Sequence, residues 1–120
     1  MRKLKAMRTA AALALAVATM TAVGASQAQA ADTRGCPSGY FCMYPGSDWN
    51  NNTPTYKYYN YGTYNLSNVT GNYIIFNNQT DGAKVRTCTG YNGTGCEGFM
   101  NPGGWLVKNM TPINSIVLLP

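Results

Sequence analysis

The sequence predicts a small all-β domain in the part of the chain that follows residue 30. No apolar repeat of about 3.6 residues, which would indicate an amphipathic helix, persists there over a helix length. Short runs rich in Tyr, Val, Ile and Phe recur instead, and clusters of Gly, Pro, Asn and Asp separate them. Several short strands with frequent turns are typical of a sandwich or a barrel.

Residues 1–30 have the composition of an export signal. Four of the nine cations lie in the first eight residues, and an apolar run rich in Ala, Leu and Val follows over 10–23. The small residues of Ala28-Gln29-Ala30 then suit a signal peptidase, so we expect a secretory signal peptide over residues 1–30. The apolar run is shorter than the roughly 20 residues that span a bilayer. We therefore expect a secreted, extracellular protein with no membrane partner after cleavage.

Removal of this segment changes the charge of the chain. Residues 31–120 carry five cations and four acidic residues, so the net charge falls from +5 for the whole sequence to +1. No cluster of cations suited to phosphates remains, and we expect no nucleic-acid partner. Residues 31–35 are expected to form a loose N-terminal tail, and residues 36–120 a single domain that is monomeric.

The predicted strands follow one another at short intervals. A faint internal repeat also appears, because Tyr44-Pro45-Gly46 follows the Cys42 strand and Tyr91-Asn92-Gly93 follows the Cys88 strand. It predicts two halves of about four strands each, which is the content of one Greek key per half. The β-prone runs are 40–44, 55–59, 73–76, 83–88, 105–107 and 116–119.

The four cysteines predict two disulfides. A domain this small gains limited stability from its core, and an even number of cysteines in an exported chain indicates crosslinks. Zinc is the weaker alternative, because the sequence contains no His and no Cys-x-x-Cys pair. The cysteines concerned are Cys36, Cys42, Cys88 and Cys96.

Three pairings of these cysteines are conceivable, and we favour the local one. Pro37-Ser38-Gly39 and the glycines of residues 90–95 supply the chain reversal that each local link needs. A crossed Cys36–Cys88 link would close a longer loop and stabilise more, so the preference rests on locality and turn content.

A resemblance to a known family covers residues 36–120. The chain resembles the actinomycete secreted family typified by the Streptomyces metalloproteinase inhibitor, which implies a βγ-crystallin-like domain of two Greek keys. The opening Cys-Pro-x-Gly-x-x-Cys-x-Tyr pattern of residues 36–44 is its most specific part. The other segments that carry it are Asn77-Asn78-Gln79-Thr80, the Cys88 to Cys96 loop and Thr111-Pro112-Ile113-Asn114-Ser115-Ile116.

The resemblance implies inhibition of an extracellular, thermolysin-like metalloproteinase through the second disulfide loop. Its candidate residues are Cys88, Thr89, Gly90 and Tyr91, with Thr89 in the position that meets the enzyme's pocket. Thr89 is smaller and more polar than the large apolar side chain that such pockets prefer. The glycines of the loop also work against preorganisation. The alternative interpretation is a structural hairpin loop that the disulfide closes.

Asn77, Asn78 and Asp81 partly match a crystallin-type calcium pattern. Calcium prefers oxygen ligands, but Asp81 and Gly82 stand where that pattern has hydroxyl residues. We expect at most weak calcium binding and no required cofactor.

The tyrosine-rich stretch supports a second functional hypothesis, a killer-toxin-like or cell-wall and glycan-binding module. Aromatic rings stack on sugar faces, and amides such as those of Trp49-Asn50-Asn51-Asn52 bond hydroxyls. A strand with one buried face shows the same alternation, with neighbouring Tyr58 and Tyr59 on opposite sides. The tyrosines of the stretch are Tyr56, Tyr58, Tyr59, Tyr61 and Tyr64.

Catalysis has little support in the composition. The usual general base near neutral pH is His, which is absent, and no two of the four carboxylates after residue 30 are close in sequence. We therefore predict a binding protein and not an enzyme.

Overall fold

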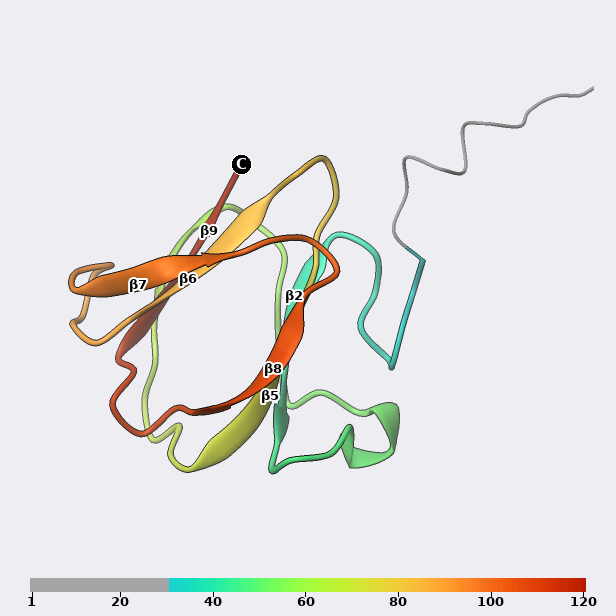
Figure 1. Ribbon diagram of the computed structural model, residues 1–120, viewed down its shortest axis with the longest axis horizontal. Helices are drawn as coiled ribbons and strands as arrows, with labels where there is room; N and C mark the ends of the chain where they lie inside the picture. Colours follow the sequence, from blue (N-terminus) through green and yellow to red (C-terminus); the bar gives the residue numbers. More distant parts are fainter. Residues whose placement is uncertain (1–30) are drawn as a thin grey trace, which may run out of the picture.

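The computed structural model describes residues 31–120, and the signal peptide predicted over residues 1–30 lies outside the described residues. The described chain is all-β, as the sequence predicts, and forms two four-stranded antiparallel sheets (Figure 1). A single 3-10 turn at Asn50–Asn52 interrupts the strands. The strands are β2 (Tyr40–Pro45), β3 (Tyr56–Tyr58), β4 (Gly62–Asn65), β5 (Asn72–Asn78), β6 (Lys84–Cys88), β7 (Cys96–Met100), β8 (Trp105–Asn109) and β9 (Ser115–Leu119).

The two halves of the chain exchange one strand each. The first sheet has the order β3-β2-β5-β8 and the second β4-β9-β6-β7. The third strand of the first half, β4, thus lies in the sheet of the second half, and β8 lies in the sheet of the first. Figure 1 shows β2, β5 and β8 in one layer and β6, β7 and β9 in the other.

Six of the eight strands coincide with the predicted β-prone runs. The sequence analysis missed β4 and β7. Gly62 and Gly98 lower the β propensity of these two segments, and none of the residues in either strand is fully buried. Pairing with neighbours makes them strands, since β4 lies along β9 and β7 along β6.

Strand β2 is buried on both of its faces. Phe41 and Met43 point into the core between the sheets, whereas Cys42 and Tyr44 point to the outer face, because successive side chains alternate. Trp49 packs against the outer cluster, with its ring centre 5.0 Å from that of Tyr44. The buried members of the central core are Phe41, Met43, Leu66, Val69, Ile75, Val85, Met110, Ile113, Ile116 and Leu118.

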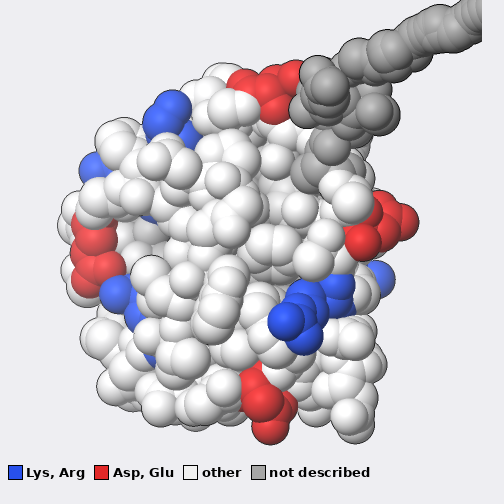
Figure 2. Space-filling model, turned by 45° about the vertical axis from the view of Figure 1, so that its right-hand side comes forward, with Lys and Arg blue, Asp and Glu red and all other residues white. Residues whose placement is uncertain are grey.

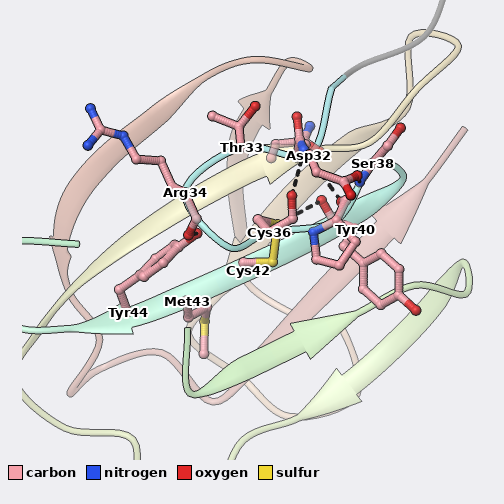
Figure 3. Close-up of a disulfide and its surroundings, with 12 residues drawn as sticks. Asp32, Thr33, Arg34, Cys36, Ser38, Tyr40, Cys42, Met43 and Tyr44 are labelled. Atoms are coloured by element: carbon pink, nitrogen blue, oxygen red, sulfur yellow. Dashed lines mark hydrogen bonds between the residues drawn. A yellow bond between two sulfur atoms is a disulfide. The ribbon is translucent and has the colours of Figure 1, made fainter. Parts of the chain in front are cut away.

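The N-terminal segment 31–35 is exposed, but the expectation that it is loose is wrong. Asn78 Nδ2 donates a hydrogen bond to the Ala31 carbonyl at 2.8 Å, and the Ser38 amide donates to Asp32 Oδ1 at 2.8 Å. Figure 3 shows this segment beside the first disulfide. Buried polar groups of the domain need partners, and the carbonyls of this segment supply them.

Tyr44 and Trp49, on the outer side of β2, also contact the segment 31–35 through Arg34. The Tyr44 hydroxyl donates to the Arg34 carbonyl at 2.8 Å (Figure 3). The Arg34 guanidinium lies 4.8 Å from the centre of the Trp49 ring, a cation–π arrangement. The segment therefore covers the outer face of β2 as part of the domain.

Both disulfides have the local pairing that the sequence analysis favours, Cys36–Cys42 and Cys88–Cys96. Residues 31–120 contain no free cysteine, so the crossed pairing is excluded. Disulfides of this kind suggest an oxidising or extracellular environment. None of the helical segments within residues 31–120 has the length and apolar character needed to cross a membrane.

Candidate functional site

The disulfide loop, residues 88–96, is a tight hairpin between β6 and β7. Its tip is an Asn92-Gly93 turn in which both residues have positive φ, 59° and 74°, and the Thr94 amide donates to the Tyr91 carbonyl at 3.3 Å. These are the features of a type I′ turn, for which Asn-Gly is the preferred sequence. Below the tip, the Gly90 amide bonds the Thr94 carbonyl at 2.9 Å.

Glycines allow the two sides of this loop to approach closely. A Cβ at Gly90 would collide with the Thr94 hydroxyl, and one at Gly95 would lie 2.8 Å from the Thr89 hydroxyl. Gly95 also has a positive φ of 64°. The glycines therefore permit a compact hairpin here, although in isolation they would favour flexibility.

Residues from outside the loop brace its first side. Asn114 Nδ2 donates to the Thr89 carbonyl at 2.8 Å. The Ser115 hydroxyl donates to the Gly90 carbonyl at 2.7 Å and accepts a hydrogen bond from the Gly93 amide at 3.0 Å. The loop is thus preorganised by hydrogen bonds in addition to its disulfide, which the sequence analysis did not foresee.

Tyr91 is the large exposed side chain of the loop, and the smaller Thr89 is exposed as well. The Thr89 amide bonds the Gly95 carbonyl at 3.0 Å, so both its N–H and its C=O are used within the domain. Its backbone is not free to pair with an extended partner. The Tyr91 side chain is 56% exposed at the tip, whereas Cys88 is fully buried at the base.

Asn77 and Asn78 are buried at the end of β5, where their amides join separate segments. Asn77 Nδ2 donates to the Ala83 and Met100 carbonyls, both at 3.0 Å, and its Oδ1 accepts two bonds from Gln79. Asp81 lies beyond them in the exposed β5–β6 turn. Within residues 31–120 no group of three His, Cys, Asp or Glu side chains could hold a metal. Calcium binding by Asn77, Asn78 and Asp81 stays a prediction.

The tyrosine-rich stretch divides between the core and the surface. Tyr56, Tyr58 and Tyr64 pack against the central core. Burial, with smaller contributions from Tyr56 and Tyr64, raises the pKa of Tyr58 to about 12. Tyr59 and Tyr61 are 59% and 55% exposed. The prediction that Tyr58 and Tyr59 face opposite sides is therefore confirmed.

Charged side chains are dispersed over the surface. On the face in Figure 2, small groups of cationic and acidic atoms lie among larger uncharged areas, and neither sign gathers into a broad patch. Lys108 Nζ and Glu97 Oε1 form an ion pair at 2.7 Å, and the hydrogen bond from Lys108 lowers the pKa of Glu97 below its usual value.

No family model, curated protein or solved structure matches the chain.

Proposed function

We propose that the chain is a secreted inhibitor of extracellular, thermolysin-like metalloproteinases, and that the disulfide loop is its contact with the enzyme. The observation that carries this proposal is the combination of an exposed tip with a rigid base. A disulfide, a type I′ turn and hydrogen bonds with Asn65, Asn114 and Ser115 fix the loop before any partner binds. A loop that is already ordered loses little conformational freedom on binding.

The family resemblance supports the same function. It implies an all-β domain with two local disulfides, and the exchange of β4 and β8 between the two halves fits a pair of interlocked Greek keys. The signal peptide expected over residues 1–30 and the disulfides support secretion.

Tyr91 is the anchor in this proposal. Its exposed ring would enter the pocket that thermolysin-like enzymes use for a large apolar side chain, a role that Tyr often takes at interfaces because it buries much surface with few torsions. This placement revises the expectation that Thr89 meets the pocket. Thr89 and Gly90 would instead flank the anchor.

The hydrogen bonds within the loop explain why the protease would be inhibited by the loop and would not cleave it as a substrate. Productive cleavage needs an extended segment, but the hydrogen bonds of Thr89 to Gly95 and Asn114 hold a hairpin. If the enzyme did cut a peptide bond within the loop, the Cys88–Cys96 disulfide would keep the two new ends together. The bound loop would then be released slowly.

Inhibition constants against a panel of thermolysin-like proteases test the proposal. A buried anchor contributes about 2 kcal/mol or more, so Tyr91→Ala is expected to weaken inhibition by at least about 30-fold. Tyr61→Ala is the matched control, because Tyr61 is equally exposed but lies in a different loop. Absence of inhibition by the wild-type protein, or full activity of Tyr91→Ala, would overturn the proposal.

A further inference from the structure

A second surface feature lies outside the disulfide loop, where three segments meet at a cleft of about 380 Å³. The segments are Ser38-Gly39 before β2, residues 59–61 between β3 and β4, and residues 79–81 between β5 and β6. Both connections cross from one sheet to the other. The volume falls within the range of roughly 300–1,000 Å³ that small-ligand sites occupy.

Tyr59 forms a supported aromatic platform in this cleft. The centre of its ring lies 5.0 Å from that of Tyr40, and the two planes are inclined by 44°. Gly39 lies against the same ring, since a Cβ at that position would be 3.1 Å from Tyr59 Cε1. The ring is thus held on its inner side, while 59% of the residue remains exposed.

Tyr61 adds a second exposed ring two residues further along the chain. The connection that carries both rings is short, and the Tyr64 hydroxyl fixes it by donating to the Asn60 carbonyl at 2.6 Å. A braced segment therefore presents two large aromatic side chains to solvent, and more than half of each residue is exposed.

The opposite wall supplies hydrogen-bond acceptors. Asp81 is exposed in a turn with a φ of 59°, which the Ala83 amide closes onto the Thr80 carbonyl at 3.1 Å. Gln79 is only 3% exposed, and its Nε2 donates to Asn77 Oδ1 at 3.0 Å and to the Lys84 carbonyl at 3.3 Å. Its Oε1 has no hydrogen-bond partner among the described residues. This oxygen is buried, so the acceptors that the wall offers to a ligand are the carboxylate oxygens of Asp81.

The charge of the cleft narrows the class of ligand. Its only charged lining side chain among the described residues is Asp81, so an anionic ligand would be repelled and would meet no cation. The exposed rings of Tyr59 and Tyr61 and the acceptor oxygens of Asp81 would suit a ligand with a flat apolar face and several hydrogen-bond donors. A pyranose ring has both, because its C–H face stacks on aromatic rings and its hydroxyls donate at the edge.

We propose that this cleft binds a neutral oligosaccharide, with sugar rings on Tyr59 and Tyr61 and hydroxyl donors toward Asp81. This activity does not depend on the disulfide loop, so it would stand whether or not the chain inhibits a protease.

Titration followed by amide chemical shifts tests the site. The probes are the hexasaccharides of glucose and of N-acetylglucosamine, with the hexasaccharide of galacturonic acid as the anionic comparison. At least one neutral probe is expected to shift the amides of residues 59–61 and 79–82, and the anionic probe to bind at least about tenfold more weakly. The loss of one stacking ring in Tyr61→Ala should weaken the neutral probe by about tenfold or more.

Two further variants separate ligand contact from folding. Asp81→Asn keeps a residue that tolerates positive φ, so the turn should persist while discrimination against the anionic probe decreases. Tyr91→Ala removes an equally exposed tyrosine from the disulfide loop and should leave saccharide binding unchanged. The proposal is overturned if neither neutral probe shifts the cleft amides, if the anionic probe binds as tightly as the neutral ones, or if Tyr61→Ala, folded by near-ultraviolet circular dichroism, binds like the wild type.

Discussion

Asn65 and Asn92 exchange two hydrogen bonds across 27 positions of sequence. The Asn92 amide donates to Asn65 Oδ1 at 2.8 Å, and Asn65 Nδ2 donates to Asn92 Oδ1 at 3.0 Å. Asn65 is the last residue of β4, and Asn92 occupies the tip of the disulfide loop. A strand from the first half of the chain thus fixes the disulfide loop of the second half.

Asn65→Ala is expected to loosen the tip of the disulfide loop. The variant removes both bonds, and because they are exposed we expect a loss of about 1 kcal/mol in the free energy of unfolding. Hydrogen exchange at the Asn92 and Gly93 amides should accelerate, and inhibition should weaken with it. Asn60→Ala is the control, since only the backbone carbonyl of Asn60 braces the fold. Unchanged exchange at the tip of Asn65→Ala would contradict this role.

The two disulfides should differ in their effect on function. Their closed loops are of similar length, so removing Cys36–Cys42 or Cys88–Cys96 by paired Cys→Ala changes should cost about 2.4 or 2.6 kcal/mol of stability respectively. Only the loss of Cys88–Cys96 releases the base of the loop that we propose to be inhibitory. Denaturant unfolding measures the stability of both variants. Inhibition constants, measured at a temperature at which both variants are folded, then show whether only the second disulfide is needed for inhibition. Equal loss of inhibition in the two variants would remove the special role of the second link.

Thr89→Val distinguishes the two positions that could meet the protease pocket. Valine has nearly the same shape as threonine and loses only the hydroxyl, which bonds the Gly95 carbonyl at 3.3 Å. With Tyr91 as the anchor, the inhibition constant should change by less than about threefold, or roughly 0.6 kcal/mol. If Thr89 entered an apolar pocket, the variant would avoid a desolvation cost of about 1–3 kcal/mol and bind about tenfold more tightly. Such tightening would move the anchor to Thr89.

Alkaline pH should destabilise the domain through Tyr58. Burial raises the pKa of this residue to about 12, so the fold favours the neutral phenol. The stabilisation is fully present below the ordinary value of 10.0 and is lost as the pH rises toward 12. Tyr58→Phe should therefore lose less stability than the wild type between these pH values. Thermal unfolding at neutral and alkaline pH measures the difference, and parallel pH profiles for the two proteins would refute it.

The sequence predicted the strands whose own residues are rich in aromatic, β-branched and other apolar side chains. The runs at 73–76 and 116–119 are apolar enough to be recognised alone, whereas β4 has one aromatic residue and β7 contains Gly98. These two segments form strands because β4 pairs with the edge of β9 and β7 with the edge of β6. Such pairing is a property of the tertiary structure and cannot be predicted from the segment alone. The anchoring of residues 31–35 was missed for the same reason, since Asn78 Nδ2 bonds the Ala31 carbonyl 47 positions away.

The candidate site was predicted in location but not in conformation. Cysteine spacing and turn residues were enough to place a closed loop at 88–96. The Thr89 carbonyl accepts a hydrogen bond from Asn114, which lies 25 positions later. No local sequence pattern indicates this long-range bond. The cleft at Tyr59 and Tyr61 likewise requires the β3–β4 and β5–β6 connections to meet at one end of the sandwich.

Because the two halves exchange β4 and β8, we expect that the domain can be divided into two complementary fragments. A break at the exposed Asp81-Gly82 turn would give two fragments, each with its own disulfide and each lacking the strand that completes its sheet. Neither fragment could bury its core alone, yet each carries the strand that the other needs. Association of the fragments and folding would then be one event. Slow hydrogen exchange at the Asn92 amide, which bonds Asn65 of the other fragment, would report that the disulfide loop has assembled.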